Sequence, residues 1–181
     1  MNWQLDPLLH LVATGFVIVV LARAVVEKLS AYGFFVANLQ DYRLLPDALA
    51  PVAAPTLLIA ELAAILCLPL PTISAIGSIT AASLFAIYAL AMAMVLLAGR
   101  HEIECGCGGE GQVVSWALVA RNGVLGAISA SIPLPTSNRA MSWPDMLVGV
   151  AATFLVFLLL AIAEKAIGTF AAIRRLGSGS H

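Results

Sequence analysis

Two cysteines separated by one glycine are the residues of this sequence best suited to chemistry. Cys105 and Cys107 lie in the segment Arg100–Gln112, which reads RHEIECGCGGEGQ. Glycine between them permits backbone conformations that are closed to other residues, so a bridge across one residue can form, although it is strained. A strained, exposed disulfide has a more oxidising potential, which suits a catalytic or regulatory bridge. The pattern therefore predicts a redox-active dithiol.

Two alternatives for this pair stay open. Thiolates with an imidazole suit zinc or copper, so Cys105, Cys107 and His101 with a glutamate could form a metal site. A structural zinc site normally shows four clear ligands, and the fourth is uncertain here, so we expect no metal. The other alternative is two incidental cysteines in a loop. Cys67 is expected to be a small, buried apolar residue.

Ionisable and polar residues inside apolar stretches are the second candidate set: Arg23, Glu61, Arg121 and Asn122. Such residues are costly in lipid and usually mark a functional interior. We expect them to form a polar pocket beneath the dithiol, where a cation could stabilise a thiolate or the anion of a reduced quinone. The alternative is a structural ion pair of Arg121 or Arg23 with Glu61. For Arg23 and Lys28, side chains that snorkel to water are favoured.

The composition places these residues in a membrane. Of 181 residues, 61% are hydrophobic and 10% are charged, and the mean hydropathy is +1.00. A soluble domain has roughly 45–50% apolar and about 25% charged residues. A net charge of -1 offers no basic face for nucleic acid. Unbroken apolar runs such as Leu155–Ala163 favour helices over a β-barrel. The fold class is therefore an all-α membrane protein embedded in a lipid bilayer.

Stretches of about 20 apolar residues are long enough to cross a bilayer as helices. The sequence predicts a bundle of four to five spans in one domain, residues 1–176, with residues 177–181 as a linker or tag remnant. The fourth candidate is weaker because Arg121 and Asn122 lie within it. The candidates are Leu8–Val26, Leu49–Leu68, Ile73–Ala98, Val113–Ile132 and Met146–Ala166.

The segment Glu27–Ala48 is too polar to span. Phe35, Leu39 and Tyr42 recur at helical spacing, with Asn38 on the opposite, polar side, so we expect a short interfacial helix. A plain connecting loop is the alternative. Because successive helices alternate in direction, this segment and the Cys105 loop should share one side of the membrane, with Cys67 at the other.

Two arguments give opposite answers for the side of the membrane that the Cys105 loop faces. With five spans, the distribution of Lys and Arg puts the loop in the cytoplasm, where disulfides are rarely maintained. We expect the loop to face the periplasm, because the chemistry requires it. In that arrangement Val113–Ile132 does not cross fully, and the C-terminus stays on the opposite, inner side.

Several short motifs resemble one family. C-G-C-G-G at Cys105–Gly109, followed by Val114-Ser115-Trp116 and Ala120-Arg121-Asn122, resembles the methylamine-utilisation MauE family of DoxX-like membrane proteins. The opening pattern agrees, with Glu27-Lys28-Leu29, Tyr42-x-x-Leu45-Pro46 and Glu61. The family often has an aromatic residue in place of Gly108.

The resemblance implies a role in the bacterial inner membrane. Such proteins are thought to act with MauD, a periplasmic thioredoxin-like protein, in maturing methylamine dehydrogenase, whose small subunit carries many disulfides. The layout is also similar to membrane thiol oxidases of the vitamin K epoxide reductase type, which place a dithiol beside a quinone pocket under a capping helix. That second likeness is one of architecture alone.

We therefore predict a membrane thiol–disulfide oxidoreductase. Cys105 and Cys107 would be catalytic, and a quinone would accept the electrons. Arg121, Asn122, Glu61 and Arg23 would bind that quinone. The rival prediction is a non-catalytic membrane anchor or scaffold for a thioredoxin-like partner, with structural cysteines.

Overall fold

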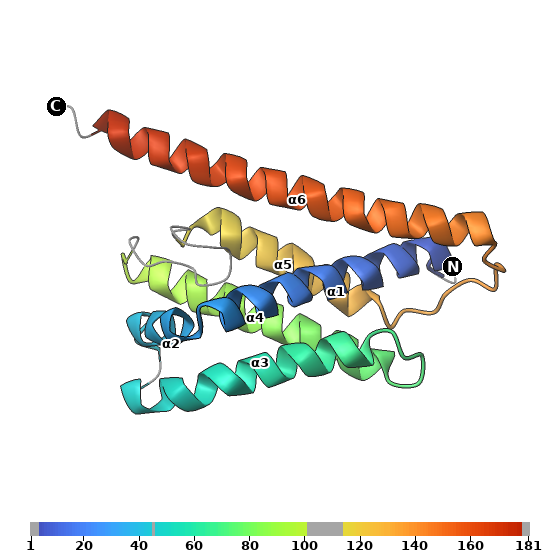
Figure 1. Ribbon diagram of the computed structural model, residues 1–181, viewed down its shortest axis with the longest axis horizontal. Helices are drawn as coiled ribbons and strands as arrows, with labels where there is room; N and C mark the ends of the chain where they lie inside the picture. Colours follow the sequence, from blue (N-terminus) through green and yellow to red (C-terminus); the bar gives the residue numbers. More distant parts are fainter. Residues whose placement is uncertain (1–3, 45, 101–113, 179–181) are drawn as a thin grey trace.

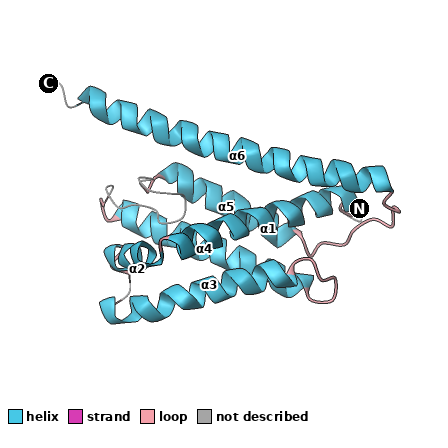
Figure 2. Cartoon of the chain, in the orientation of Figure 1, coloured by secondary structure: helices cyan, strands magenta, loops and turns pink. Residues whose placement is uncertain are grey.

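The computed structural model describes residues 4–44, 46–100 and 114–178 of the chain. These residues form helices joined by short turns, and no strand occurs among them (Figure 2). The predicted all-α fold is therefore confirmed. The helices are α1 (Pro7–Ser30), α2 (Tyr32–Asp41), α3 (Ala50–Cys67), α4 (Ser74–Leu97), α5 (Trp116–Ser131) and α6 (Trp143–Ser178), with a single 3-10 turn, Asp47–Leu49, before α3.

The helix ends follow from local sequence signals. The Asp6 carboxylate accepts a hydrogen bond from the Leu8 backbone N–H at 2.8 Å, and Pro7 opens α1. At the start of α6, Asp145 accepts from the backbone N–H and hydroxyl of Ser142 at 2.9 and 2.8 Å. Prolines lie in the turn between α3 and α4 and after α5, where they end the helices.

Four helices are long and apolar enough to cross a membrane: α1, α3, α4 and the first 24 residues of α6. The chain is therefore a multi-pass membrane protein. The sixteen residues of α5 extend about 24 Å, which is shorter than the roughly 30 Å hydrocarbon core. The structure thus agrees with the prediction of four to five spans and with the weakness of the fourth candidate.

Close backbone contacts hold the bundle together. A Cβ added to Gly77 would lie 2.7 Å from the backbone nitrogen of Leu68, so the turn between α3 and α4 requires a glycine there. A Cβ added to Gly15 of α1 would lie 3.0 Å from the hydroxyl oxygen of Thr153 on α6. Small residues at such crossings let membrane helices approach closely.

Alternating helix directions place the predicted segments as expected. The end of α1, α2, the start of α3, the end of α4 and the start of α5 all lie at one end of the bundle (Figure 1). Cys67, the last residue of α3, belongs to the opposite end. It is half-buried rather than fully buried.

The end of α6 departs from the expected arrangement. Because α5 runs antiparallel to both α4 and α6, α6 ends on the same side as the start of α5 (Figure 1). The C-terminal helix end and the residues that flank the Cys105 segment, Arg100 and Val114, therefore share one end of the bundle. The expectation that the C-terminus lies opposite that segment is wrong.

The polar segment after the first span also differs in its bounds. Glu27 and Lys28 belong to the last turn of α1, which continues to Ser30, because both side chains have partners within the bundle. The predicted short helix is confirmed as α2. Its buried residues are Phe35 and Asn38, so Asn38 does not lie on a polar, solvated side.

Candidate functional site

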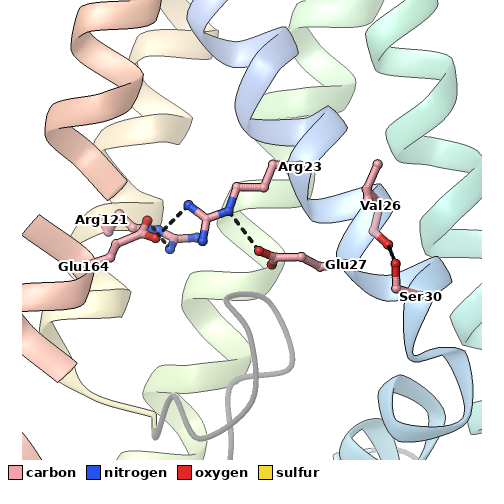
Figure 3. A network of polar contacts seen from close by, with 6 residues as sticks. All are labelled: Arg23, Val26, Glu27, Ser30, Arg121 and Glu164. Atoms are coloured by element: carbon pink, nitrogen blue, oxygen red, sulfur yellow. Dashed lines mark hydrogen bonds and ion pairs between the residues drawn. The ribbon is translucent and has the colours of Figure 1, made fainter. Parts of the chain in front are cut away.

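A network of four charged side chains joins α1, α5 and α6 (Figure 3). Nε of Arg23 donates to Glu27 at 2.8 Å, and Nη1 of Arg23 donates to Glu164 at 3.2 Å. The other carboxylate oxygen of Glu164 accepts from Nη1 of Arg121 at 2.6 Å. Glu164 is 8% exposed. One buried carboxylate thus neutralises two arginines from different helices. The side chain of Arg23 is 33% exposed, and the prediction that it snorkels stays a prediction.

A second ion pair is fully buried. Lys28 of α1 donates to Oε1 of Glu61 on α3 and, at 3.1 Å, to the hydroxyl of Tyr88 on α4. That hydroxyl donates to the same oxygen of Glu61 at 2.7 Å. The side chains of Lys28 and Glu61 are both 0% exposed. The prediction that Lys28 snorkels is wrong, because the carboxylate and the phenol give its ammonium polar partners inside the bundle.

The four residues predicted to bind a cofactor lie around one small cavity: Arg23, Glu61, Arg121 and Asn122. The predicted residues therefore lie together, whereas the position of their cavity beneath the dithiol stays a prediction, because the cysteines lie outside the described residues. The volume of the cavity is about 20 Å³, which accommodates about one water molecule. The expected pairing of Arg121 or Arg23 with Glu61 is wrong, because Lys28 pairs with Glu61 and Glu164 pairs with both arginines. A quinone-binding role for these four residues stays a prediction.

Asn122 is buried beside this cavity, and its Nδ2 donates to the backbone carbonyl of Leu118 at 2.9 Å. Oε2 of Glu61 and Nε of Arg121 are also buried, and neither has a hydrogen-bond partner within the described part of the chain. A bound water could partner such groups. The arrangement therefore suits hydrated charge pairing better than the accommodation of a ring.

A larger pocket of about 410 Å³ lies between α2, α3 and α4. This value falls in the range typical of small-molecule sites. Apolar and aromatic side chains make up most of the wall, and Asn38 is the one amide. The residues are Phe35, Asn38, Leu39, Tyr42, Leu44, Leu57, Ile87, Tyr88, Leu90, Ala91, Met92 and Met94.

Tyr88 lines both spaces, so its ring separates the small polar cavity from the larger pocket. The pocket is also close to the start of α5. Val114 packs in a buried cluster with Met92, and Tyr42 and Tyr88 pack against that cluster. Three residues of the pocket wall thus belong to the group that surrounds Val114, which follows Cys107 by seven positions.

The predicted catalytic residues Cys105 and Cys107 lie outside the described residues, as does His101 of the metal alternative. Among the described residues, no group of three or more His, Cys, Asp or Glu side chains could hold a metal ion. The redox and metal interpretations of this segment therefore both stay predictions.

Two residues of these sites were missed by sequence reasoning. Glu164 resembles the polar end of a span because Lys165 follows it, yet it lies buried against two arginines. A signal existed, since Arg23 and Arg121 together needed more negative charge than Glu61 supplies. Asn38 was placed on a polar helix face, and only its contacts with α3 and α4 reveal its burial.

Several known proteins are similar to this chain over most of its length. The family model for methylamine utilisation protein MauE matches residues 6–135. A methylamine utilization protein MauE of Paracoccus versutus is 37% identical over 158 residues, which are 85% of this chain and 84% of the relative. The Methylorubrum extorquens protein of that name is 32% identical over 86% of this chain and 85% of its own. No solved structure matches the chain.

Proposed function

Because the chain belongs to the MauE family of methylamine utilisation proteins, we propose that it is a membrane thiol–disulfide oxidoreductase. Cys105 and Cys107 are its reactive pair, and a periplasmic thioredoxin-like protein is its electron donor. A membrane quinone is its electron acceptor. The reaction supports disulfide formation during the maturation of methylamine dehydrogenase.

The observation that carries this proposal is the position of the Cys-Gly-Cys sequence. It connects α4 to α5 at the end of the bundle where α2 covers the larger pocket. Only seven positions separate Cys107 from Val114, whose packing cluster includes residues of the pocket wall. A dithiol and a lipid-facing pocket near one helix start are the parts that electron transfer to a membrane-soluble acceptor needs.

The chemistry balances without any further reactant. A thiolate of the partner attacks one sulfur of the Cys105–Cys107 disulfide, which forms a mixed disulfide and releases the other sulfur as a thiolate. The partner's second thiolate then attacks the mixed disulfide, so the partner leaves oxidised and both cysteines are reduced. Re-forming the bridge releases two electrons and two protons, which convert the quinone to a quinol.

The charged network has a supporting role in this proposal. Arg23, Arg121 and Glu164 fix α6 against α1 and α5, and Lys28 with Glu61 fixes α1 against α3. A buried cluster that includes Leu96 and Val114 packs the end of α4 against the start of α5. We therefore expect the bridge between Cys105 and Cys107 to open and close without movement of α4 and α5.

The test is oxidation of a reduced thioredoxin-like partner by membranes that contain the protein. We expect the Cys105→Ser and Cys107→Ser variants to lose the activity to the level of membranes without the protein. Cys67→Ser is the matched control, because Cys67 lies at the opposite end of the bundle, and it should keep full activity.

A membrane-impermeant alkylating reagent provides the second measurement. In intact cells it should label Cys105 and Cys107 only after reduction, and added quinone should abolish that labelling. Full partner oxidation by the double cysteine variant would instead establish the scaffold function. Labelling only after the membrane is opened would place the cysteines in the cytoplasm and overturn the proposal.

A further inference from the structure

The pocket under α2 has the features of a ligand-binding site separate from the reactive cysteines. We infer that this pocket binds the ring of a lipid-soluble quinone, with the amide of Asn38 as its polar contact. The inference rests on the proposed function for the identity of the ligand. It differs from the sequence prediction, which placed the quinone among Arg23, Glu61, Arg121 and Asn122.

Volume is the first argument for this pocket. The polar cavity of about 20 Å³ has room for a water molecule, whereas the pocket under α2 has about 410 Å³. The two spaces are neighbours, because Tyr88 lines both. A ring that enters from the membrane therefore fits on the α2 side of Tyr88 and not on the side of the ion pairs.

Access from the bilayer is the second argument. Ile87, Leu90 and Met94 of α4 line the pocket and are 51%, 61% and 48% exposed. On a membrane-spanning helix, exposed apolar side chains face lipid. The pocket therefore has a wall on the lipid-facing side of α4, where a hydrophobic molecule dissolved in the membrane arrives.

An unsatisfied amide is the third argument. Asn38 is 4% exposed, and its Nδ2 is buried without a hydrogen-bond partner within the described part of the chain. Such a group is costly unless a ligand or water accepts its hydrogen. The amide torsion of asparagine is broad, so a small rotation turns Nδ2 towards a ligand without moving α2. A quinone carbonyl is the acceptor that this donor fits.

The shape of the wall is the fourth argument. Phe35, Tyr42 and Tyr88 line the pocket, and the ammonium of Lys28 lies over the rings of Phe35 and Tyr88. Aromatic side chains in the wall favour a planar ring as the ligand. An acyl chain would fill an apolar groove equally well but would leave the amide of Asn38 unpaired. The combination of aromatic side chains, one buried donor and a lipid-facing wall therefore selects a planar molecule that carries carbonyl groups.

The test measures binding, not turnover, so that it is separate from the redox activity. The protein carrying Cys105→Ser and Cys107→Ser is placed in nanodiscs and titrated with ubiquinone-1 by calorimetry. We expect saturable binding at one site. Asn38→Leu keeps the branched shape of the side chain but removes one hydrogen bond, so it should weaken binding by about 3- to 10-fold.

A matched pair of tryptophan substitutions on α4 checks the location. Ala91→Trp places a large ring in the pocket and should abolish binding. Ile79→Trp places the same ring on an exposed position of the same helix, outside the pocket, and should leave binding unchanged. Both variants must elute and unfold like the parent protein, and the Asn38→Leu result stands independently if Ala91→Trp does not fold.

The outcomes separate this inference from the proposed function. Absence of ubiquinone-1 binding, or equal binding by Ala91→Trp, overturns the quinone pocket even if the cysteines oxidise the partner. Displacement by decane with no effect of Asn38→Leu identifies an acyl-chain groove and also overturns it. Binding that depends on Asn38, together with cysteines that do not exchange with the partner, confirms the pocket and overturns the redox function.

Discussion

The two spaces on either side of Tyr88 use polar groups in opposite ways. On the inner side, the charges of Lys28 and Glu61 neutralise each other within the bundle. On the α2 side, the amide of Asn38 is buried among apolar walls and has no partner in the described residues. The comparison teaches that abundant charge in a membrane bundle indicates structural pairing. Atoms without a described partner lie beside both spaces, at Oε2 of Glu61 and Nδ2 of Asn38, so the volume beside each decides whether water or a ligand fits there.

The largest expected effect tests the structural side of this comparison. Glu61→Leu removes the carboxylate that pairs with the buried ammonium of Lys28 and leaves it beside the Tyr88 hydroxyl and the rings of Phe35 and Tyr88. It should cost about 3–5 kcal/mol of stability. The double variant Lys28→Met with Glu61→Leu should recover most of that loss, because no buried charge then remains unpaired. Thermal unfolding in nanodiscs measures both, and a double variant as unstable as Glu61→Leu would contradict the structural role.

A smaller effect is expected where the charges are partly exposed. Glu164→Gln removes the carboxylate that Arg23 and Arg121 share and should cost about 1.5–3 kcal/mol. The matched control is Glu27→Gln, which removes a half-buried partner of Arg23 and should cost less than about 1 kcal/mol. Equal losses in the same unfolding assay would show that Glu164 has no special place in the network.

The smallest expected effect has the opposite sign and sharpens the ligand side. Without quinone, Asn38→Leu should leave stability unchanged or raise it by about 1 kcal/mol, because it removes a buried amide that lacks a partner. The same variant should bind ubiquinone-1 more weakly. A marked loss of stability in Asn38→Leu would mean that the amide is structural, and the contrast between the two spaces would fail.

The helices were predictable because their signals are local. Apolar runs of about 20 residues, prolines in the turns and the Ser142–Asp145 helix start are all legible in the sequence. The side shared by α2 and the start of α5 follows from counting helix directions. The four polar residues around the small cavity were also predictable. Polar groups that face lipid cost free energy, so they gather in the interior of the bundle.

The partners of these residues were not predictable, since pairing depends on which helix faces which. Lys28 lies near a helix end and looks able to reach water, yet the packing of α1 on α3 brings it to Glu61. From the sequence alone, Glu164 would be placed at the end of a membrane span, and only the path of α6 brings its carboxylate to Arg121. Residues of α2, α3 and α4 together form the larger pocket, so no single stretch of the sequence predicts it.

The pairing of α5 with α6 also sets an order of events during synthesis. Glu164 follows Arg121 by 43 residues, and ribosomes add about 5–20 residues per second. For several seconds α5 therefore enters the membrane with an arginine whose counterion has not yet been made. A helix of sixteen residues with an unpaired cation inserts poorly alone. The emergence of α6 from the translocon is thus the event that gives Arg121 its counterion, on a helix that already packs against α4 and α1.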